Sequence, residues 1–180
     1  MIETIKLVKT FDGFKALNEL DIKVPQGSVY GLVGPNGAGK STVIRHLAGI
    51  YRQDSGHVLI DGQPVYENND IKGRIAYIPD EISYYPQAGI EDMKNFYKRI
   101  YPNFSTERFE KLRSSFDLDP KRPMRKLSKG MQKQAAFWLA LSKSPDIIIL
   151  DEPVDGLDPV MRRQVWSLIL SEVAENGTTV

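Results

Sequence analysis

The residues most suited to chemistry form one glycine-rich stretch that ends in a lysine and two hydroxyl side chains: Gly34, Pro35, Asn36, Gly37, Ala38, Gly39, Lys40, Ser41 and Thr42. The stretch fits the pattern G-x-x-x-x-G-K-[ST], in which glycines let the backbone curl so that successive N–H groups point at a phosphate. A helix that follows such a loop adds its positive N-terminal end. Lys40 would contact the β- and γ-phosphates, and the Ser41 hydroxyl would bind Mg²⁺. We therefore expect a loop that binds ATP together with Mg²⁺.

Two acids follow the densest apolar run of the chain, Ile147–Leu150. Such a run is typical of a buried parallel strand, so Asp151 and Glu152 would lie at a strand end. Asp151 is expected to hold Mg²⁺, directly or through a water. Glu152 could point at a water in line with the γ-phosphate and act as a general base. The pair would complete the chemistry that the glycine-rich loop begins.

Hydrophobic periodicity predicts the elements that would position these residues. Strands are expected over 2–8, 20–24, 28–33, 75–78 and 147–150, with a hairpin over 56–62. Helices are expected over 41–49, 90–101, 106–116, 128–143 and 159–174. The Asp61-Gly62 pair is the turn signal of the hairpin, and Ser128 is an N-cap. The pattern indicates an α/β core interrupted by a helical insert at about 85–145.

Composition narrows the classes of function. At 180 residues the chain fits one domain, and a net charge of +1 gives no global field toward nucleic acid. The absence of cysteine excludes disulfides and thiol catalysis. No apolar stretch fits a signal peptide or a membrane span. We expect a cytoplasmic protein that reaches a membrane only through a partner and binds no nucleic acid.

Three further stretches identify a family. They are Leu127-Ser128-Lys129-Gly130-Met131-Gln132, Asp151-Glu152-Pro153 and Gly156-Leu157-Asp158-Pro159. With the glycine-rich loop, they make the sequence resemble the ATP-binding cassette (ABC) family over residues 1–180. The resemblance implies a P-loop NTPase core with a mixed, mainly parallel sheet and an N-terminal antiparallel β subdomain. It also implies one nucleotide-binding domain, with the core at about 1–84 and 146–180 and the helical subdomain at about 85–145.

The resemblance also implies roles for single residues. Phe11 matches the aromatic residue that stacks on adenine. Ser128 and Gly130 match the signature residues that contact the γ-phosphate held by the opposite subunit, and Asp158 matches a residue that crosses the dimer interface. In the family two such domains, identical or different, pair head to tail around two ATP molecules.

The sequence departs from the family pattern in three places. The signature is usually LSGGQ, whereas Lys129 and Met131 stand here. The glutamine expected after Ile75–Pro79 is Asp80, which could still reach Mg²⁺ through water and act near the γ-phosphate. The family's switch histidine would lie a few residues past Val180. We therefore expect a C-terminally truncated domain in which ATP binding outlasts hydrolysis.

Three functions compete. The first is the ATP-hydrolysing subunit of a transporter, with permease subunits on other polypeptides at the inner face of the cell membrane, most similar to bacterial ABC-2-type exporters. The alternative is a soluble ABC ATPase that acts on ribosomes or nucleic acid. Its coiled-coil subclass is excluded because the segment between Asp80 and Leu127 is short and has no heptads. A small P-loop kinase leaves the Leu127–Gln132 stretch unexplained. The transporter subunit is the preferred hypothesis.

Overall fold

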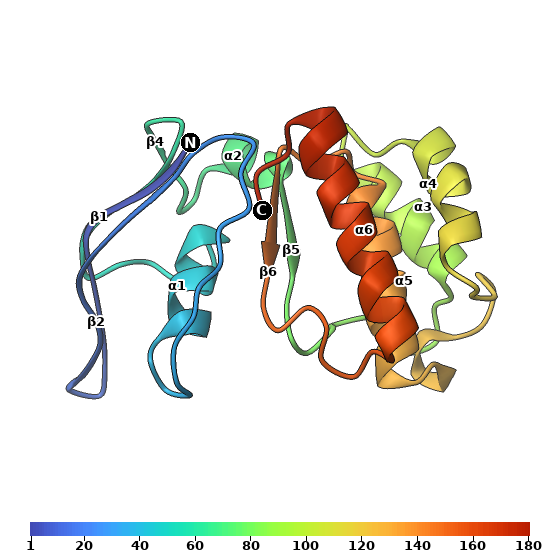
Figure 1. The fold of residues 1–180 in the computed structure, drawn as a ribbon, viewed down its shortest axis with the longest axis horizontal. Coiled ribbons are helices and arrows are strands. Elements are labelled where there is room, and N and C mark those ends of the chain that lie inside the picture. Colours follow the sequence, from blue (N-terminus) through green and yellow to red (C-terminus); the bar gives the residue numbers. More distant parts are fainter. The chain divides into compact units, whose positions relative to one another are not determined.

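The computed structural model describes residues 1–180, which divide into two compact units (Figure 1). The β-rich unit contains Met1–Ile75, Asp146–Ile149 and Val173–Val180. The helical unit contains Ala76–Pro145 and Leu150–Glu172. No helix in either unit has both the length and the apolar character needed to cross a membrane.

An antiparallel sheet forms most of the β-rich unit. Its strands are β1 (Ile2–Phe11), β2 (Phe14–Val24), β3 (Ser55–Ile60) and β4 (Gln63–Pro64), in the order β2-β1-β3-β4. Two-residue turns join β1 to β2 and β3 to β4. Asp12-Gly13 has φ values of 46° and 82°, and Asp61-Gly62 has 49° and 76°. Paired positive φ values match the twist of a hairpin, which confirms the predicted hairpin and explains the antiparallel start of the chain.

Two helices accompany this sheet. Helix α1 (Lys40–Leu47) buries Val43, Ile44, His46 and Leu47, which confirms the helix predicted after the glycine-rich loop. Helix α2 (Asn69–Arg74) was not predicted. It is short, and its signal is local: the Asn68 side chain accepts a hydrogen bond from the Ile71 N–H as an N-cap.

The strand predicted over 28–33 is wrong. Backbone hydrogen bonds join Tyr30 N–H to the Val180 carbonyl (2.7 Å) and Val180 N–H to the Ser28 carbonyl (2.9 Å). These bonds involve only the start of the segment, and the Val33 side chain is 97% exposed. A strand needs a paired neighbour along its length, which an apolar pattern alone does not guarantee.

A second sheet contains β5 (Ile75–Ile78) and β6 (Ile147–Leu150), and the chain passes between the two units within both strands. In the β-rich unit, Asp146 N–H donates to the Arg74 carbonyl at 3.0 Å. In the helical unit, Asp151 N–H donates to the Ile78 carbonyl at 3.0 Å. Thr179 adds one parallel bridge to Ile147. The fold is thus mixed α/β, with a larger antiparallel sheet and a smaller parallel one.

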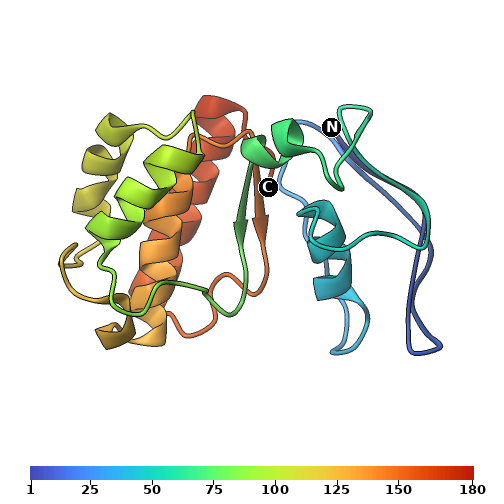
Figure 2. The ribbon, with the colours of Figure 1, turned by 180° about the vertical axis from the view of Figure 1, so that it is seen from behind.

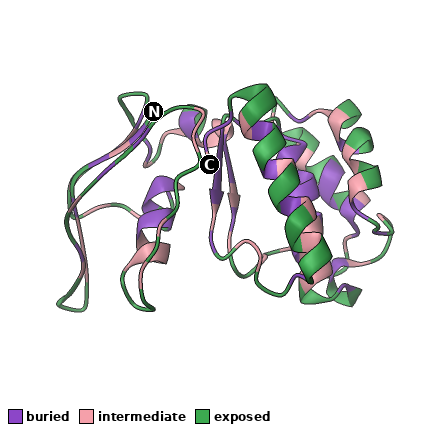
Figure 3. Ribbon diagram, in the orientation of Figure 1, coloured by how far each residue is buried: buried purple, intermediate pink, exposed green.

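The helical unit is built around α5 (Lys129–Leu141), which α3 (Ile90–Ile100) and α4 (Thr106–Leu112) contact (Figure 2). Helix α6 (Pro159–Asn176) shows one buried and one exposed face, whereas most of α5 is buried (Figure 3). The Trp138 ring stacks on Phe109, with 4.4 Å between ring centroids. Its indole N–H donates to the Phe109 carbonyl at 2.8 Å. Because the indole N–H has a hydrogen-bond acceptor, Trp138 fills the core without leaving a buried donor unpaired.

Candidate functional site

The glycine-rich loop lies in the β-rich unit, immediately before α1. Gly37 and Gly39 have φ values of 82° and 87°, a region that non-glycine residues rarely adopt. They turn the chain sharply into the helix. The first turn of α1 contains no acidic residue, so nothing there opposes a bound anion. The local geometry therefore fits a phosphate group.

Gly39 is required for a second reason. A Cβ at this position would lie 2.8 Å from the Ala16 carbonyl oxygen and 3.1 Å from a methyl group of Leu17. The loop can therefore pack on β2 only with glycine here. The packing fixes the start of α1, where Lys40 is the first helical residue.

The Lys40 ammonium folds back over the loop. Its Nζ donates to the Gly34 carbonyl at 2.8 Å and to the Pro35 carbonyl at 3.1 Å. A lysine ammonium has three donors and rotates freely, so it can exchange such partners for phosphate oxygens. Lys40 therefore has the reach and the charge expected of a phosphate contact.

Phe11, the predicted adenine contact, ends β1 and is 39% exposed. Its ring meets Tyr51 edge to face, with 5.6 Å between centroids, and the Lys9 ammonium lies 5.4 Å from its centre. Tyr51 in turn accepts a hydrogen bond from Arg45 of α1 at 2.9 Å. The aromatic ring is thus supported from two sides and keeps surface for stacking.

The two acids lie after β6 in the helical unit. Asp151 is 6% exposed, whereas Glu152 is exposed. Glu152 has a φ of 47°, the left-handed conformation that costs a non-glycine residue about 1–3 kcal/mol. Asp155 N–H donates to the Glu152 carbonyl at 3.3 Å and closes a turn. The backbone thus places the two carboxyl groups differently, one buried and one open to solvent.

The signature residues lie at the N-terminus of α5. The Ser128 hydroxyl accepts from the Met131 N–H at 3.2 Å, which confirms Ser128 as the N-cap. A Cβ on Gly130 would lie 2.7 Å from the Gly156 carbonyl oxygen, so glycine is needed for this close approach. Asp158 caps α6, because its Oδ1 accepts from the N–H groups of Val160 (2.9 Å) and Met161 (3.1 Å).

Comparisons with known proteins agree with this geometry. The family model described as "ABC transporter" matches residues 17–155. The chain belongs to this family. It is 34% identical over 180 residues to the ABC transporter ATP-binding protein YtrB of Bacillus subtilis, covering 100% of this chain and 62% of YtrB. It is 36% identical over 190 residues to the daunorubicin/doxorubicin resistance ATP-binding protein DrrA of Streptomyces peucetius, covering 99% and 56%.

A solved ATP-binding subunit of an ABC transporter superposes with a TM-score of 0.89 at 26% identity, covering 97% of this chain and 75% of that chain. The ABC cassette fold is therefore shown. The chain spans only about three fifths of the length of the curated relatives YtrB and DrrA.

The predicted ABC site residues fall into two groups, one in each unit. Phe11 and the loop Gly34–Thr42 belong to the β-rich unit. The helical unit holds Asp80, Ser128, Gly130, Asp151, Glu152 and Asp158. Within the helical unit the structure brings Asp80, the signature helix and the turn after Glu152 together. Two residues that the sequence analysis did not single out make these contacts.

Those two residues are Gln132 and Lys133 of α5. The Gln132 amide nitrogen donates to the Tyr84 hydroxyl (3.1 Å) and to the Met124 and Leu127 carbonyls (3.2 and 3.1 Å), which fixes the segment before the signature. The Lys133 ammonium bonds Asp80 and the turn after Glu152. One signal could have found Lys133: it follows Gly130 by three positions and therefore shares its helix face.

His46 shows how tightly α1 is packed. It is 1% exposed, and its Nδ1 lies 2.7 Å from the Thr42 carbonyl, to which it donates. Burial lowers the pKa of His46 below its ordinary value of 6.5. The ring therefore packs as a neutral group on α1, against the Thr42 carbonyl.

This burial predicts a pH dependence of stability. The unfolded chain binds the imidazole proton more readily than the native chain, so the free energy of unfolding should fall as the pH drops below 6.5. Urea unfolding at pH 7 and pH 5 measures this loss. His46→Leu should make the loss smaller, and an unchanged pH dependence in that variant would assign the effect to other groups.

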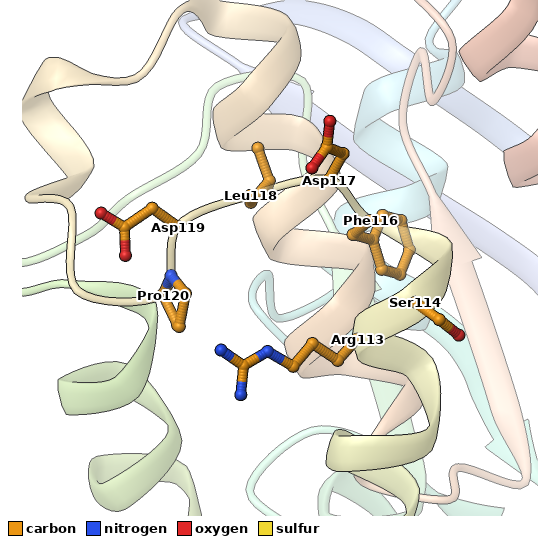
Figure 4. A pocket seen from close by; sticks show the side chains of 7 residues that line it. All are labelled: Arg113, Ser114, Phe116, Asp117, Leu118, Asp119 and Pro120. Carbon is orange, nitrogen blue, oxygen red and sulfur yellow. The ribbon is translucent and has the colours of Figure 1, made fainter.

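A further hollow of about 580 Å³ lies beside the end of α4, lined by the segment 113–120. Figure 4 shows that Arg113, Asp117 and Asp119 contribute its charged groups. No predicted site residue lines this hollow, so it is not part of the candidate site.

Proposed function

We propose that the protein binds and hydrolyses ATP and so powers transport through separate permease subunits. The observation that carries this proposal is the loop before α1. There Gly37 and Gly39 adopt left-handed conformations and the Lys40 ammonium lies over the loop carbonyls. A loop of this kind, leading into a helix without acids in its first turn, binds the phosphates of a nucleotide.

The residues of the loop would divide the work. The backbone of Gly34–Thr42 surrounds the phosphates, Lys40 neutralises charge on the β- and γ-phosphates, and Phe11 stacks on the base. Ser41 offers a hydroxyl and Asp151 a carboxylate, the oxygen ligands that Mg²⁺ prefers. When bound, Mg²⁺ would neutralise the charge that develops on the phosphate oxygens.

Glu152 is the proposed general base. Its carboxylate is exposed, and its backbone is held in one unusual conformation, so the side chain can meet a water from a fixed direction. Asp80 is proposed to assist near the γ-phosphate or, through water, the metal. Its ion pair with Lys133, at 3.4 Å, offsets the charge that an acid adds beside a phosphate.

The site is proposed to be completed by a second cassette subunit. Ser128 is exposed at the N-terminus of a 13-residue helix, where a hydroxyl and free N–H groups can meet an anion. The γ-phosphate of the opposite subunit is the proposed anion. Gly130 and Asp158 would then lie at the interface between the two cassettes, which are identical or different chains.

The permease is proposed to dock on the helical part of the chain, the subdomain at about 85–145, whereas residues 1–84 and 146–180 are proposed to form the ATP-binding core. Tyr85 and Phe96 are 57% and 38% exposed and meet edge to face at 5.4 Å. Exposed aromatic residues of this kind suit a protein interface. The protein would then act at the inner face of the cell membrane as a subunit of an ABC-2-type exporter, and its similarity to DrrA, a drug-resistance ATP-binding protein, is in line with export.

Mixing two inactive variants tests the shared site. Lys40→Ala damages the phosphate loop and Ser128→Arg blocks the signature, so each variant alone should lack ATPase activity. In a 1:1 mixture, half of the dimers are mixed, and each mixed dimer has one intact site. About a quarter of the wild-type activity should therefore return, because a two-fold symmetric dimer has two equivalent sites. No recovery in a mixture that still forms dimers would contradict a site shared between subunits.

A further inference from the structure

Lys133 is a buried lysine whose ammonium group is surrounded by three hydrogen-bond acceptors. It is 4% exposed, and its Nζ lies 2.6 Å from the Glu152 carbonyl, 3.2 Å from the Asp155 carbonyl and 3.4 Å from Asp80 Oδ1. An ammonium has three donors, and here three acceptors meet it. A charge is buried in this way only when its partners are held in place. The three acceptors therefore stabilise the buried ammonium, and the ammonium in turn fixes the positions of the three acceptors.

Two of those partners lie at the two ends of the turn that begins at the second acid of the pair. Glu152 and Asp155 are its first and last residues, and Asp155 N–H donates to the Glu152 carbonyl at 3.3 Å. Gly130 lies three positions before Lys133, on the same face of α5. The Cα of Gly130 lies so close to the Gly156 carbonyl that a Cβ on Gly130 would be 2.7 Å from the carbonyl oxygen. Two residues on one face of α5, Gly130 and Lys133, therefore contact the backbone of residues 152–156.

The backbone conformation of Glu152 requires stabilising contacts of this kind. Its φ of 47° lies in the left-handed region, which a residue with a side chain keeps only when its surroundings impose it. The shortest bond of Lys133 is to the carbonyl of this residue. If the turn relaxed toward negative φ, the direction of the Glu152 side chain would change with it.

We propose that Lys133 is a positioning residue for ATP hydrolysis, which holds the 152–156 turn so that the Glu152 carboxylate points in one direction. The proposal rests on the proposed function, because it gives Glu152 a direction that matters only if Glu152 acts on a water. The third bond, to Asp80, joins the loop after β5 to the same point. A hollow of about 500 Å³ beside Lys133, lined by Asp80, Tyr84, Asp155 and Gly156 among others, would let water reach these groups once the ammonium is lost.

The test uses the full-length protein with Lys133→Met, which keeps the length of the side chain and removes all three donors. The turnover number should fall at least about tenfold, because a displacement near 1 Å can cost about a hundredfold. KM for ATP should stay within about threefold, since the three hydrogen-bond partners of Lys133 are Asp80, Glu152 and Asp155, none of which is proposed to bind the β-phosphate or the base. Hydrogen exchange at the Asp155 amide should become faster, because its turn has lost two anchors. Lys133→Arg should restore most of the turnover, since a guanidinium can still donate to the carbonyls.

Lys111→Met is the matched control, because Lys111 is an exposed lysine of α4. It should leave turnover and exchange unchanged. If Lys133→Met does not fold, Lys133→Gln takes its place and should show the same loss of turnover with an unchanged KM. Wild-type turnover in either variant would overturn the proposal, and so would equal losses in the Met and Arg variants with unchanged exchange at Asp155.

Failure of the proposed function would look different. In that case the wild-type protein itself would hydrolyse no ATP. Hydrogen exchange alone would then test whether Lys133 stabilises the 152–156 turn. Faster exchange at the Asp155 amide in Lys133→Met supports this role, and unchanged exchange contradicts it.

Discussion

Replacing Glu152 with glutamine is expected to slow ATP hydrolysis at least about a hundredfold, the contribution typical of a general base. ATP binding should persist, because Glu152 lies in the turn after β6 and the phosphate loop lies before α1. Glutamine has the size of glutamate, and the Glu152 carbonyl that Lys133 holds belongs to the backbone, so the turn keeps its shape. What changes is the side-chain oxygen, which can no longer accept a proton from water.

A trapped complex is the second expected result for this variant. If the proposed site is shared between two cassettes through Ser128, ATP that is bound but not cleaved would leave the two cassettes without a step that separates them. Size-exclusion chromatography with Mg-ATP should show a dimer for Glu152→Gln and mostly monomer for the wild type after turnover. Glu107→Gln, the same change at an exposed position of α4, is the control and should behave as wild type. Wild-type turnover in Glu152→Gln would show that another group activates the water.

Much of the fold could be predicted because its signals are local. The Asp61-Gly62 turn, the Ser128 N-cap and the apolar run Ile147–Leu150 each specify their structure within a few residues, and all three are as expected. The glycine-rich loop belongs to the same class, because Gly37 and Gly39 encode its curvature directly. The segment 28–33 failed because a strand depends on partners far along the chain, which the segment itself does not specify.

The contacts of Lys133 could not be predicted for the same reason. Its three acceptors come from residues 80, 152 and 155, which are separated from it by 53, 19 and 22 positions. On sequence alone, Asp80 was an unusual acid in place of a glutamine, and Lys133 was one of the two charged residues of its helix, with Lys129. The structure makes them a pair. The added negative charge of Asp80 therefore comes with the positive charge of the buried Lys133, whose Nζ lies 3.4 Å from Asp80 Oδ1.

Replacing Lys40 with alanine should abolish ATP binding or weaken it at least about a hundredfold, since charged hydrogen bonds to phosphate contribute about 1.5–3 kcal/mol each. The structure adds a second cause. The Lys40 ammonium also bonds the Gly34 and Pro35 carbonyls, so its loss removes two contacts within the loop that would surround the phosphates. Lys40→Arg should not restore affinity, because a planar guanidinium is larger and cannot fit the same curled loop.

Isothermal titration with a non-hydrolysable ATP analogue and Mg²⁺ measures this loss directly. Lys23→Ala is the matched control, because Lys23 is an exposed lysine of the same unit, on β2, and should leave affinity unchanged. Thermal unfolding of Lys40→Ala should stay close to wild type, since the lost bonds are to loop carbonyls that solvent can satisfy. Full affinity in a folded Lys40→Ala variant would mean that the backbone of the loop alone holds the nucleotide. The comparison with Glu152→Gln then separates the two steps: one variant should fail to bind, whereas the other should bind and fail to release.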